Sequence, residues 1–382
     1  MQASTSTPTA GHNGTIFLSI ELSQKVWLVT MHSPDRDKFS RHQVAGGNYV
    51  ELLALIERIR DRVERQLGYR PEVASCYEAG YDGFWLHRLL MAAGITNYVF
   101  DPASIAVEQR HRRAKTDRID GEVLLRTLMA HLRGEPRVVR IVHVPTEAQE
   151  DARRASRERD RLVKERTAHV NRIKGLLRQK GIAVGKPRQG DWLSWLAEQR
   201  DWRGNTVPEN LLAEVRDEHE RLMLICRQIV ALERRSEKAD LAAAEAGTVN
   251  DRVLLRRLKS LGPVFSAALA NEVFYKDFRN SREVGSYFGL APSPWRSGGM
   301  DREQGISKAG NPRARQKAIE LAWLWVQHQP GSALTEWFRG RTVNASKRIK
   351  RISIVALARK LVVALWRYLR TGLVPEGAII AG

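Results

Sequence analysis

Cysteine is scarce in this sequence of 382 residues, with only Cys76 and Cys226, which lie far apart and outside any C-x-x-C spacing. Neither a disulfide framework nor a zinc ribbon is therefore indicated. No stretch approaches the roughly 18 uninterrupted apolar residues of a membrane-spanning helix. Residues 1–14 lack the basic and apolar segments of a secretory signal, and we expect a disordered lead there. These absences predict a cytoplasmic protein that is neither exported nor membrane-bound.

Negative charge is also in short supply. The chain has 63 Lys and Arg against 43 Asp and Glu, a formal net charge of +20, and 43% of its residues are hydrophobic. Such a chain can bury a core in each of two or three domains. The excess of positive charge is typical of proteins that bind nucleic acid and would favour association with the nucleoid. The alternative is a basic protein whose charge serves only solubility.

Strands and helices alternate over residues 15–145, which predicts an α/β domain with a mixed sheet. Residues 15–33 have two apolar, β-branched runs around a polar turn and predict a hairpin, with a third strand at 38–44. Apolar spacing predicts an amphipathic helix over 48–66. A buried strand at 72–80, a helix at 86–94 and a strand at 95–102 follow.

Residues 146–248 have a different character, with long charged helices that predict a helical coiled-coil arm. A heptad seam runs through one of these helices and is broken only by Glu218. Its apolar members are Leu211, Val215, Leu222, Ile225, Ile229 and Leu232. The seam could mediate dimerisation or pair with another helix of the same chain, and the sequence does not choose between them.

A mostly helical C-terminal domain is predicted over residues 249–375, interrupted by the Gly, Pro and Ser-rich loop GLAPSPWRSGG. Between Leu334 and Arg370 there are ten Lys and Arg but one acidic residue, Glu336. A run of charge is commonly a solvated face, yet so one-sided a run is better explained by contact with phosphates.

Four carboxylates of the first domain form a candidate metal site. Phosphodiester chemistry commonly uses two Mg²⁺ ions about 4 Å apart, held by carboxylates from several elements. Glu21 ends the first strand, Glu78 ends the strand that contains Cys76, and Asp117 and Asp120 open a helix on one face. Taken singly, each aspartate could be a simple helix-start residue, and Glu21 a surface residue. Glu78 follows a hydrophobic strand and is expected to need a partner or a metal.

Basic residues in three places are candidates for binding nucleic acid. A dense basic loop precedes the aspartates and suits contact with a DNA backbone. The others flank the serine loop or open the last long helix. The candidates are Arg110, Arg112, Arg113, Lys115, Arg118, Arg296, Lys308, Arg313, Arg315, Lys347, Arg348, Lys350 and Arg351.

Ser297 lies between Arg296 and two glycines, which permit a close approach of the backbone to a ligand. A serine that attacks phosphorus needs a base or a metal, and no histidine lies nearby in the sequence. On these residues alone, a plain turn is the more favoured interpretation. Ser307 is a competing hydroxyl in a context typical of helix capping.

Several ordered motifs resemble the IS110-type family of insertion-sequence transposases, relatives of the Piv invertase that act as bridge-RNA-guided recombinases. In the first domain these are IELSQKVWLV, YEAGYDGFWLHRLL and AKTDRIDGEVL, similar to that family's RuvC-like (RNase H-like) DEDD domain. In the C-terminal domain they are LKSLGPVFSAALANEV, REVGSYFGLAPSPWRSGG and GISKAGNPRARQKAIELAW. The resemblance spans nearly the whole chain.

The resemblance implies that Glu78, Asp117 and Asp120 are the second, third and fourth metal ligands and that Ser297 is a nucleophile that forms a phosphoserine link to DNA. The first ligand position, usually aspartate, is Glu21 here, and its extra methylene moves the carboxylate outward by about a bond length. Further implications are a homo-oligomer, from dimer to tetramer, with composite sites, and a noncoding bridge RNA that pairs with donor and target DNA.

Three hypotheses follow. The first is a recombinase in which Ser297 attacks DNA. The second is a metal-dependent nuclease or Holliday-junction resolvase of RuvC type, with water as nucleophile. The third is a non-catalytic protein that binds nucleic acid. A covalent protein–DNA adduct distinguishes the first, cleavage without an adduct the second, and binding that survives loss of every acidic candidate the third.

Overall fold

The computed structural model describes residues 14–105, 117–247, 250–297 and 300–381. The chain divides into two compact units, residues 1–144 and 145–382, and each is described by itself. The lead predicted over 1–14 lies, apart from Gly14, outside the described residues. In the described part of the chain, every helix is too short or too polar to cross a membrane.

The first unit is built on a mixed five-stranded sheet with strand order β3-β2-β1-β4-β5. β1 pairs antiparallel with β2 and parallel with β4, and β4 pairs parallel with β5. The elements are β1 (Thr15–Glu21), β2 (Val26–His32), β3 (Ser40–Ala45), α1 (Tyr49–Leu67), β4 (Glu72–Glu78), α2 (Trp85–Ala92), β5 (Thr96–Phe100), η2 (Pro102–Ser104) and α3 (Asp117–Leu132). The predicted mixed α/β sheet is confirmed, and its arrangement is consistent with an RNase H-like domain.

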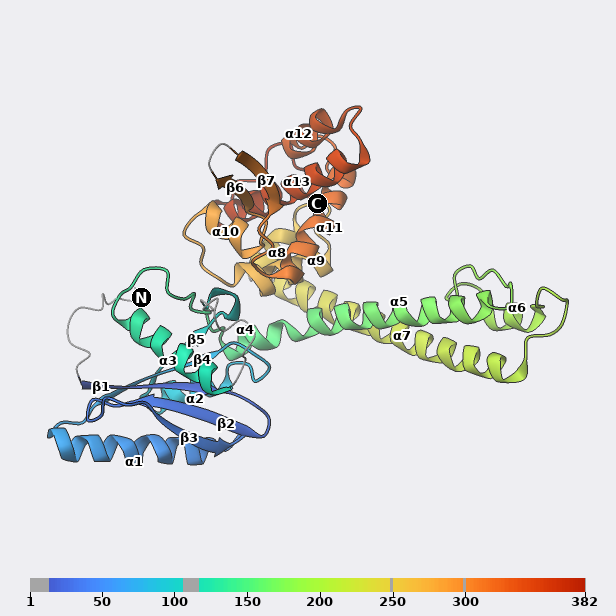
Figure 1. Cartoon of the computed structure of the whole chain (residues 1–382). Coiled ribbons are helices and arrows are strands. Elements are labelled where there is room, and N and C mark those ends of the chain that lie inside the picture. Colours follow the sequence, from blue (N-terminus) through green and yellow to red (C-terminus); the bar gives the residue numbers. More distant parts are fainter. Residues whose placement is uncertain (1–13, 106–116, 248–249, 298–299, 382) are drawn as a thin grey trace. The chain divides into compact units, whose positions relative to one another are not determined.

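Helices cover both faces of this sheet (Figure 1). The side chains of β1 alternate, because successive residues of a strand point to opposite faces. Ile16 and Leu18 pack on the side of α1 and α2, whereas Phe17 packs with Leu125 of α3 on the other side. α1 begins after Asn48, whose side chain accepts a hydrogen bond from the backbone N–H of Glu51.

Gly121 allows the first turn of α3 to lie directly on the sheet. A Cβ atom at this position would stand 2.7 Å from Oγ1 of Thr30, which is buried in β2. The hydroxyl of Ser19 in β1 donates a hydrogen bond of 2.7 Å to the carbonyl oxygen of Gly121. This close approach fixes the start of α3 above β1 and β2, next to Asp120.

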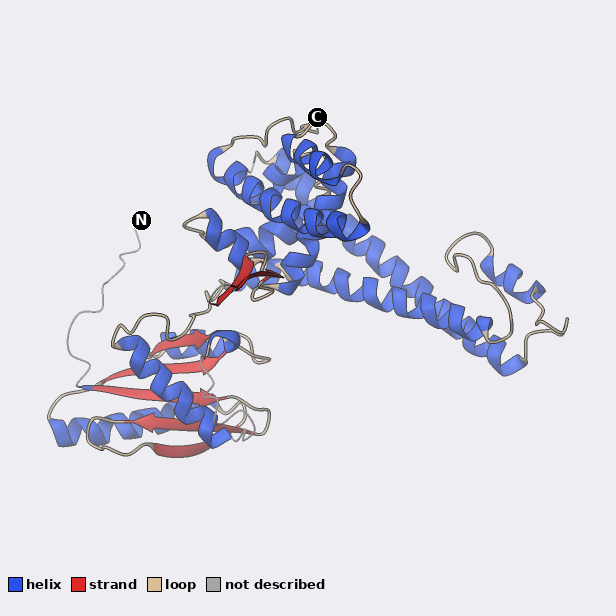
Figure 2. Cartoon of the chain, turned by 45° about the horizontal axis from the view of Figure 1, so that its top comes forward, coloured by secondary structure: helices blue, strands red, loops and turns tan. Residues whose placement is uncertain are grey.

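The second unit begins with a helical arm (Figure 2). Its elements are α4 (Glu147–Ala152), α5 (Arg154–Arg178), α6 (Trp192–Glu198) and α7 (Glu209–Glu245). α5 and α7 lie side by side, and their buried residues include Ile173 and Leu177 of α5 with Val215 and Leu222 of α7. Of the two uses left open for the heptad seam, the pairing within one chain is the one found.

Glu218, which breaks the apolar seam, is buried between the two helices at 2% exposure. It accepts hydrogen bonds from His169 (2.6 Å), Arg172 (2.9 Å) and Arg221 (2.7 Å). Burial alone would raise the pKa of Glu218, but these hydrogen bonds outweigh burial and lower the pKa. The break in the seam is therefore a buried carboxylate held ionised by its neighbours.

The C-terminal part of the second unit is mostly helical, as predicted. Its elements are α8 (Asp251–Arg256), α9 (Pro263–Leu269), the π-helix η4 (Ala270–Phe274), α10 (Ser281–Tyr287), β6 (Pro292–Ser297), β7 (Met300–Ile306), α11 (Pro312–His328), α12 (Ala333–Thr342) and α13 (Lys347–Thr371). Trp325 of α11 and Leu361 of α13 are fully buried in its core.

Two predictions for this region are wrong. GLAPSPWRSGG was expected to be a loop, but β6 and β7 form an antiparallel hairpin whose ladder runs from Pro292 opposite Ile306 to Ser297 opposite Met300. The register shifts between Pro292 and Pro294, which is how the ladder accommodates proline. Ser307 does not cap a helix: its N–H donates to the carbonyl of Ala291, and Asn311 caps α11.

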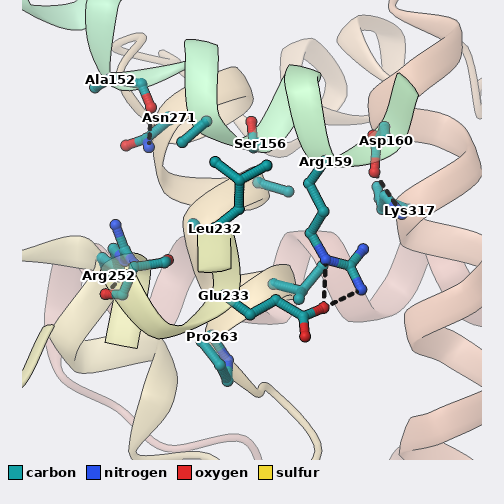
Figure 3. A pocket seen from close by; sticks show the side chains of 15 residues that line it. Ala152, Ser156, Arg159, Asp160, Leu232, Glu233, Arg252, Pro263, Asn271 and Lys317 are labelled. Carbon is teal, nitrogen blue, oxygen red and sulfur yellow. Dashed lines mark hydrogen bonds and ion pairs between the residues drawn. The ribbon is translucent and has the colours of Figure 1, made fainter. Parts of the chain in front are cut away.

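Ion pairs join the base of the arm to the C-terminal helices. Glu272 of η4 is 3% exposed and accepts hydrogen bonds of 2.7 and 2.8 Å from Arg157 of α5. Nearby, a small cavity of about 40 Å³ is lined by α5, α7, α9 and α11. Figure 3 shows Lys317 reaching Asp160 there and Arg159 reaching Glu233. The arm and the C-terminal helices are thus one connected body.

Candidate active site

Three of the four predicted carboxylates border one cavity of about 380 Å³ in the first unit. Because β1 and β4 run parallel, their carboxyl ends meet at the same edge of the sheet, and Glu21 and Glu78 end these two strands. Asp120 reaches the same cavity from the first turn of α3. Three separate elements therefore each contribute one carboxylate to the border of this cavity.

The three carboxylates differ in exposure. Glu21 is half-buried, and its Oε2 atom is shielded from solvent. Asp120 is also half-buried, whereas Glu78 is exposed. β4 is buried through Tyr77, and the chain emerges at Glu78, so this carboxylate ends a buried strand but is itself exposed.

Asp117 is the first residue of α3, three positions before Asp120, as predicted. The side chains of Asp117 and Arg118 lie outside the described part of the structure. So do Arg110, Arg112, Arg113 and Lys115 of the basic loop. Of the four predicted ligands, only Glu21, Glu78 and Asp120 can therefore be placed at the cavity.

Two residues that the sequence analysis did not single out also line the cavity. Asp82 adds a fourth described carboxylate, and Tyr81 beside it is 93% exposed. Both follow Glu78 in the segment EAGYDG, so an acidic residue with a neighbouring aromatic, directly after a strand end, was the available signal. A tyrosine so exposed at a cavity mouth is suited to stack on a base.

The donor set of the cavity fits a divalent metal of the magnesium type. Such ions prefer carboxylate oxygens, and every acidic group of the cavity supplies them. Among the described side chains, no three His, Cys, Asp or Glu groups lie close enough together to hold a metal ion. The chemistry of the donors nevertheless fits such an ion.

The nearest thiol takes no part in this donor set. Cys76 points to the α3 face of β4, where its Sγ lies 3.6 Å from the carbonyl oxygen of Leu124. Burial raises the pKa of the Cys76 thiol well above its usual range, which keeps it protonated. Asp101, which follows β5, caps η2 and pairs with Arg140 at 3.0 Å, so it has a structural role outside the cavity.

The predicted basic residues of the second unit whose side chains are described fall into two groups. Arg313 pairs with Asp160 at 2.9 Å, and Arg315 donates to the carbonyl oxygens of Phe288 and Lys308, so both support the fold. The other group is exposed on the surface. Its members are Lys308, Lys347, Arg348, Lys350 and Arg351.

Ser297 is the last residue of β6, and the side chains of Ser297 and Arg296 lie outside the described part. The base of the hairpin is held firmly, because the N–H of Lys308 donates to the carbonyl of Gly289 and that of Asn311 to Tyr287. Lys308 adopts a φ of 55°, and a Cβ at Gly310 would stand 2.5 Å from the Tyr287 carbonyl oxygen. The segment GISKAGNPR thus fixes the chain where it leaves the hairpin.

Comparison with known proteins gives the family. A profile described as the transposase IS116/IS110/IS902 family matches residues 252–336, and a profile of the DEDD transposase of IS110 elements, described as transposase, matches residues 24–182. A candidate transposase of Sinorhizobium fredii, y4rJ, is 47% identical over 377 residues, which cover 96% of this chain and 95% of that protein. The chain belongs to the IS110 family of transposases.

More distant relatives of this IS110-family transposase agree. The transposase for insertion sequence element IS1328 of Yersinia enterocolitica is 27% identical over 58% of this chain and 63% of its own length. The transposase for insertion sequence element IS1111A of Coxiella burnetii is 25% identical over 74% of each chain. The matched DEDD region contains Glu78, Asp117 and Asp120 and begins after Glu21, and the second matched region contains Ser297. Membership of this family makes DNA the substrate, and a DEDD transposase domain implies the use of a divalent metal.

Proposed function

We propose that this transposase cuts and rejoins DNA as a site-specific recombinase, with Ser297 as the nucleophile that forms a covalent link to a DNA phosphate. The observation that carries the proposal is the meeting of Glu21, Glu78 and Asp120 at one cavity, formed by the ends of two parallel strands and the first turn of α3. This supports the proposal because metal-dependent phosphodiester chemistry uses carboxylates contributed by several elements.

Glu21, Glu78, Asp117 and Asp120 would hold the metal, with two Mg²⁺ ions as the expected occupants. When bound, these ions supply positive charge to a phosphate and make a hydroxyl easier to deprotonate. The carboxylates make the electrostatic potential of the cavity negative. They therefore repel a phosphate group until bound cations neutralise them. Arg296 would contribute to charge stabilisation beside Ser297, and the basic loop at 110–118 would hold the DNA backbone.

Two partners complete the proposal. A noncoding bridge RNA would select donor and target DNA by base pairing, which leaves shape and backbone for the protein to read. Homo-oligomers, from dimer to tetramer, would bring a first unit to a serine hairpin. The apolar seam of the arm is already filled by α5, so any contact between copies through the arm would use its outer faces.

Recombination in vitro with the element's flanking noncoding RNA tests this function. We expect Ser297→Ala and Asp117→Ala each to abolish both recombination and the covalent protein–DNA adduct, because the attack needs the hydroxyl and the metal that activates it. Ser307→Ala is the matched control, because that hydroxyl lies on the same segment of chain, and we expect it to recombine normally. Normal recombination by Ser297→Ala would show that the nucleophile is assigned wrongly.

A metal-dependent nuclease is the second candidate. One observation favours it: the cavity is lined entirely by residues of the first unit, so hydrolysis by water needs no group from the second. Under this alternative, wild type and Ser297→Ala cleave DNA equally and neither leaves an adduct on a denaturing gel.

A further inference from the structure

A second, larger hollow lies on the C-terminal helices, along one face of α13. It has a volume of about 1080 Å³ and is bordered by α13, α12, α10 and the β6–β7 hairpin. We call it the α13 groove. Seven of the described residues that line it are basic and none is acidic: Lys308, Arg341, Arg348, Arg351, Arg359, Lys360 and Arg367.

The floor of the α13 groove is apolar. Ile352, Val355 and Val363 of α13 line it together with Leu290 and Ile306 from the hairpin side. Arg348, Ile352, Val355 and Arg359 follow one another at intervals of three or four residues, so they share one face of the helix. The opposite face, with Ile354, Leu357 and Leu361, is buried in the core. The groove face is therefore a mixed stripe of cations and aliphatic side chains that the fold does not cover.

The cations of the groove are not used to hold the fold together. Within the described residues, none of the seven forms an ion pair with an acidic side chain, in contrast to Arg157, Arg252 and Arg313 elsewhere in this unit. Arg359 lies against α10 at a glycine: a Cβ on Gly285 would stand 3.1 Å from Nε of Arg359. Lys360 lies 4.9 Å from the centre of the Trp337 ring. These side chains are held in position by packing, and their positive charge is available to bind an anion.

We propose that the α13 groove binds a single-stranded segment of DNA, with phosphates on its basic rim and unpaired bases against its apolar floor. Charge complementarity points to a polyanion. An apolar floor favours an unpaired strand, because the faces of bases are exposed only when they are not stacked in a duplex. Among the described residues that line the groove, Ser281 is the only one with a hydroxyl group, so little is present to read a 2′-hydroxyl, and DNA is favoured over RNA.

The β6–β7 hairpin sets the path of the bound DNA strand. Pro292, Gly305 and Ile306 of β6 and β7 form one wall of the groove, and β6 continues from there to Ser297. A strand held in the groove would therefore follow the hairpin. Binding in the groove requires neither Ser297 as nucleophile nor metal at the carboxylate cavity, so it goes beyond the proposed function and can be tested apart from it.

The experiment measures binding of the full-length protein to a fluorescent 20-nucleotide DNA strand by anisotropy, in EDTA and at several salt concentrations. We expect the double variant Arg348→Ala with Arg351→Ala to weaken binding about tenfold or more and to reduce the salt dependence by about 0.7 in the slope for each lost phosphate contact. The matched control is Arg216→Ala with Arg227→Ala, two exposed arginines of α7, for which we expect less than about a twofold change.

The floor is tested separately. Ile352 is 55% exposed, so Ile352→Ser is expected to fold normally and to weaken strand binding with an unchanged salt slope. Leu224→Ser on α7, at 47% exposure, is its control and is expected to bind as wild type. Equal losses in the groove and control pairs would overturn the proposal. So would groove-dependent binding that is tighter for duplex DNA, for an RNA strand of the same sequence or for polyglutamate than for the DNA strand.

Discussion

The two units use acidic side chains in opposite ways. In the second unit, Glu218 and Glu272 are buried against arginines and hold helices together. In the first unit, Glu21, Glu78 and Asp120 border a cavity at the edge of a sheet. A carboxylate bound to arginines inside the fold contributes to stability. Carboxylates gathered around a hollow repel one another, so such a group is more typical of a functional site than of a stabilising one. Where a carboxylate lies therefore predicts what its loss will change.

The largest effect on activity is expected from Asp120→Asn. The substitution keeps the size of the side chain and removes its charge. We expect recombination to fall by about a hundredfold or more, while the melting temperature changes by no more than about 2 °C. Magnesium should raise the melting temperature of the wild type but not of the variant, because only a folded site binds the ion. A variant that melts much lower than wild type would place Asp120 among the structural acids.

The second prediction concerns how the first turn of α3 is held. A Cβ at Gly121 would collide with Thr30, so Gly121→Ala should destabilise the protein by about 1–3 kcal/mol and displace Asp120. Gly175→Ala is the matched control from the second unit: it is also within a helix, but its Cβ would meet nothing within 4 Å. There we expect a gain of about 0.5–1 kcal/mol. Urea unfolding measures both, and equal effects would contradict the close approach at Gly121.

The third prediction uses pH to expose the structural acid of the arm. Hydrogen bonds lower the pKa of Glu218 below its ordinary value of 4.5, so its ionised form stabilises the folded state above that pH. This stabilisation is lost as the pH falls below 4.5. Glu218→Leu, which completes the apolar seam, should lose less stability than wild type when the pH is lowered from 7 to 3.5. Glu220→Leu, an exposed position of the same helix, should follow the wild type, and parallel profiles for all three proteins would refute the assignment.

The difference between the units also explains how far the sequence could predict the site. Strand ends and a helix start are local features, so the positions of Glu21, Glu78 and Asp120 followed from apolar patterns and from the rule that parallel strands end together. Glu218 was visible only as a break in a seam, because its partners His169 and Arg172 come from another helix. Packing between distant segments decides such a residue, and no local pattern encodes it.

The hairpin that carries Ser297 was missed for a related reason. Proline, glycine and serine dominate GLAPSPWRSGG and indicate a loop, since proline cannot donate to a ladder. The strands nevertheless form because the register shifts between Pro292 and Pro294 and because the following segment is fixed to Gly289 and Tyr287. Asp82 was overlooked because it lies four residues beyond Glu78, in the segment EAGYDG that follows the strand rather than at the strand end itself.

The smallest effect is expected from Glu21→Asp. Glu21 ends β1 with part of its carboxylate shielded from solvent, and it borders the cavity in a family whose resemblance led us to expect aspartate here. Shortening the side chain keeps the charge and moves it by about a bond length, so we expect recombination to be kept or raised, within about tenfold of wild type. Parallel assays of Glu21→Gln, which keeps the length and removes the charge, should show a much larger loss. If Glu21→Asp were the more damaging of the two, reach rather than charge would be what this position contributes, and the cavity would be fitted to the longer side chain.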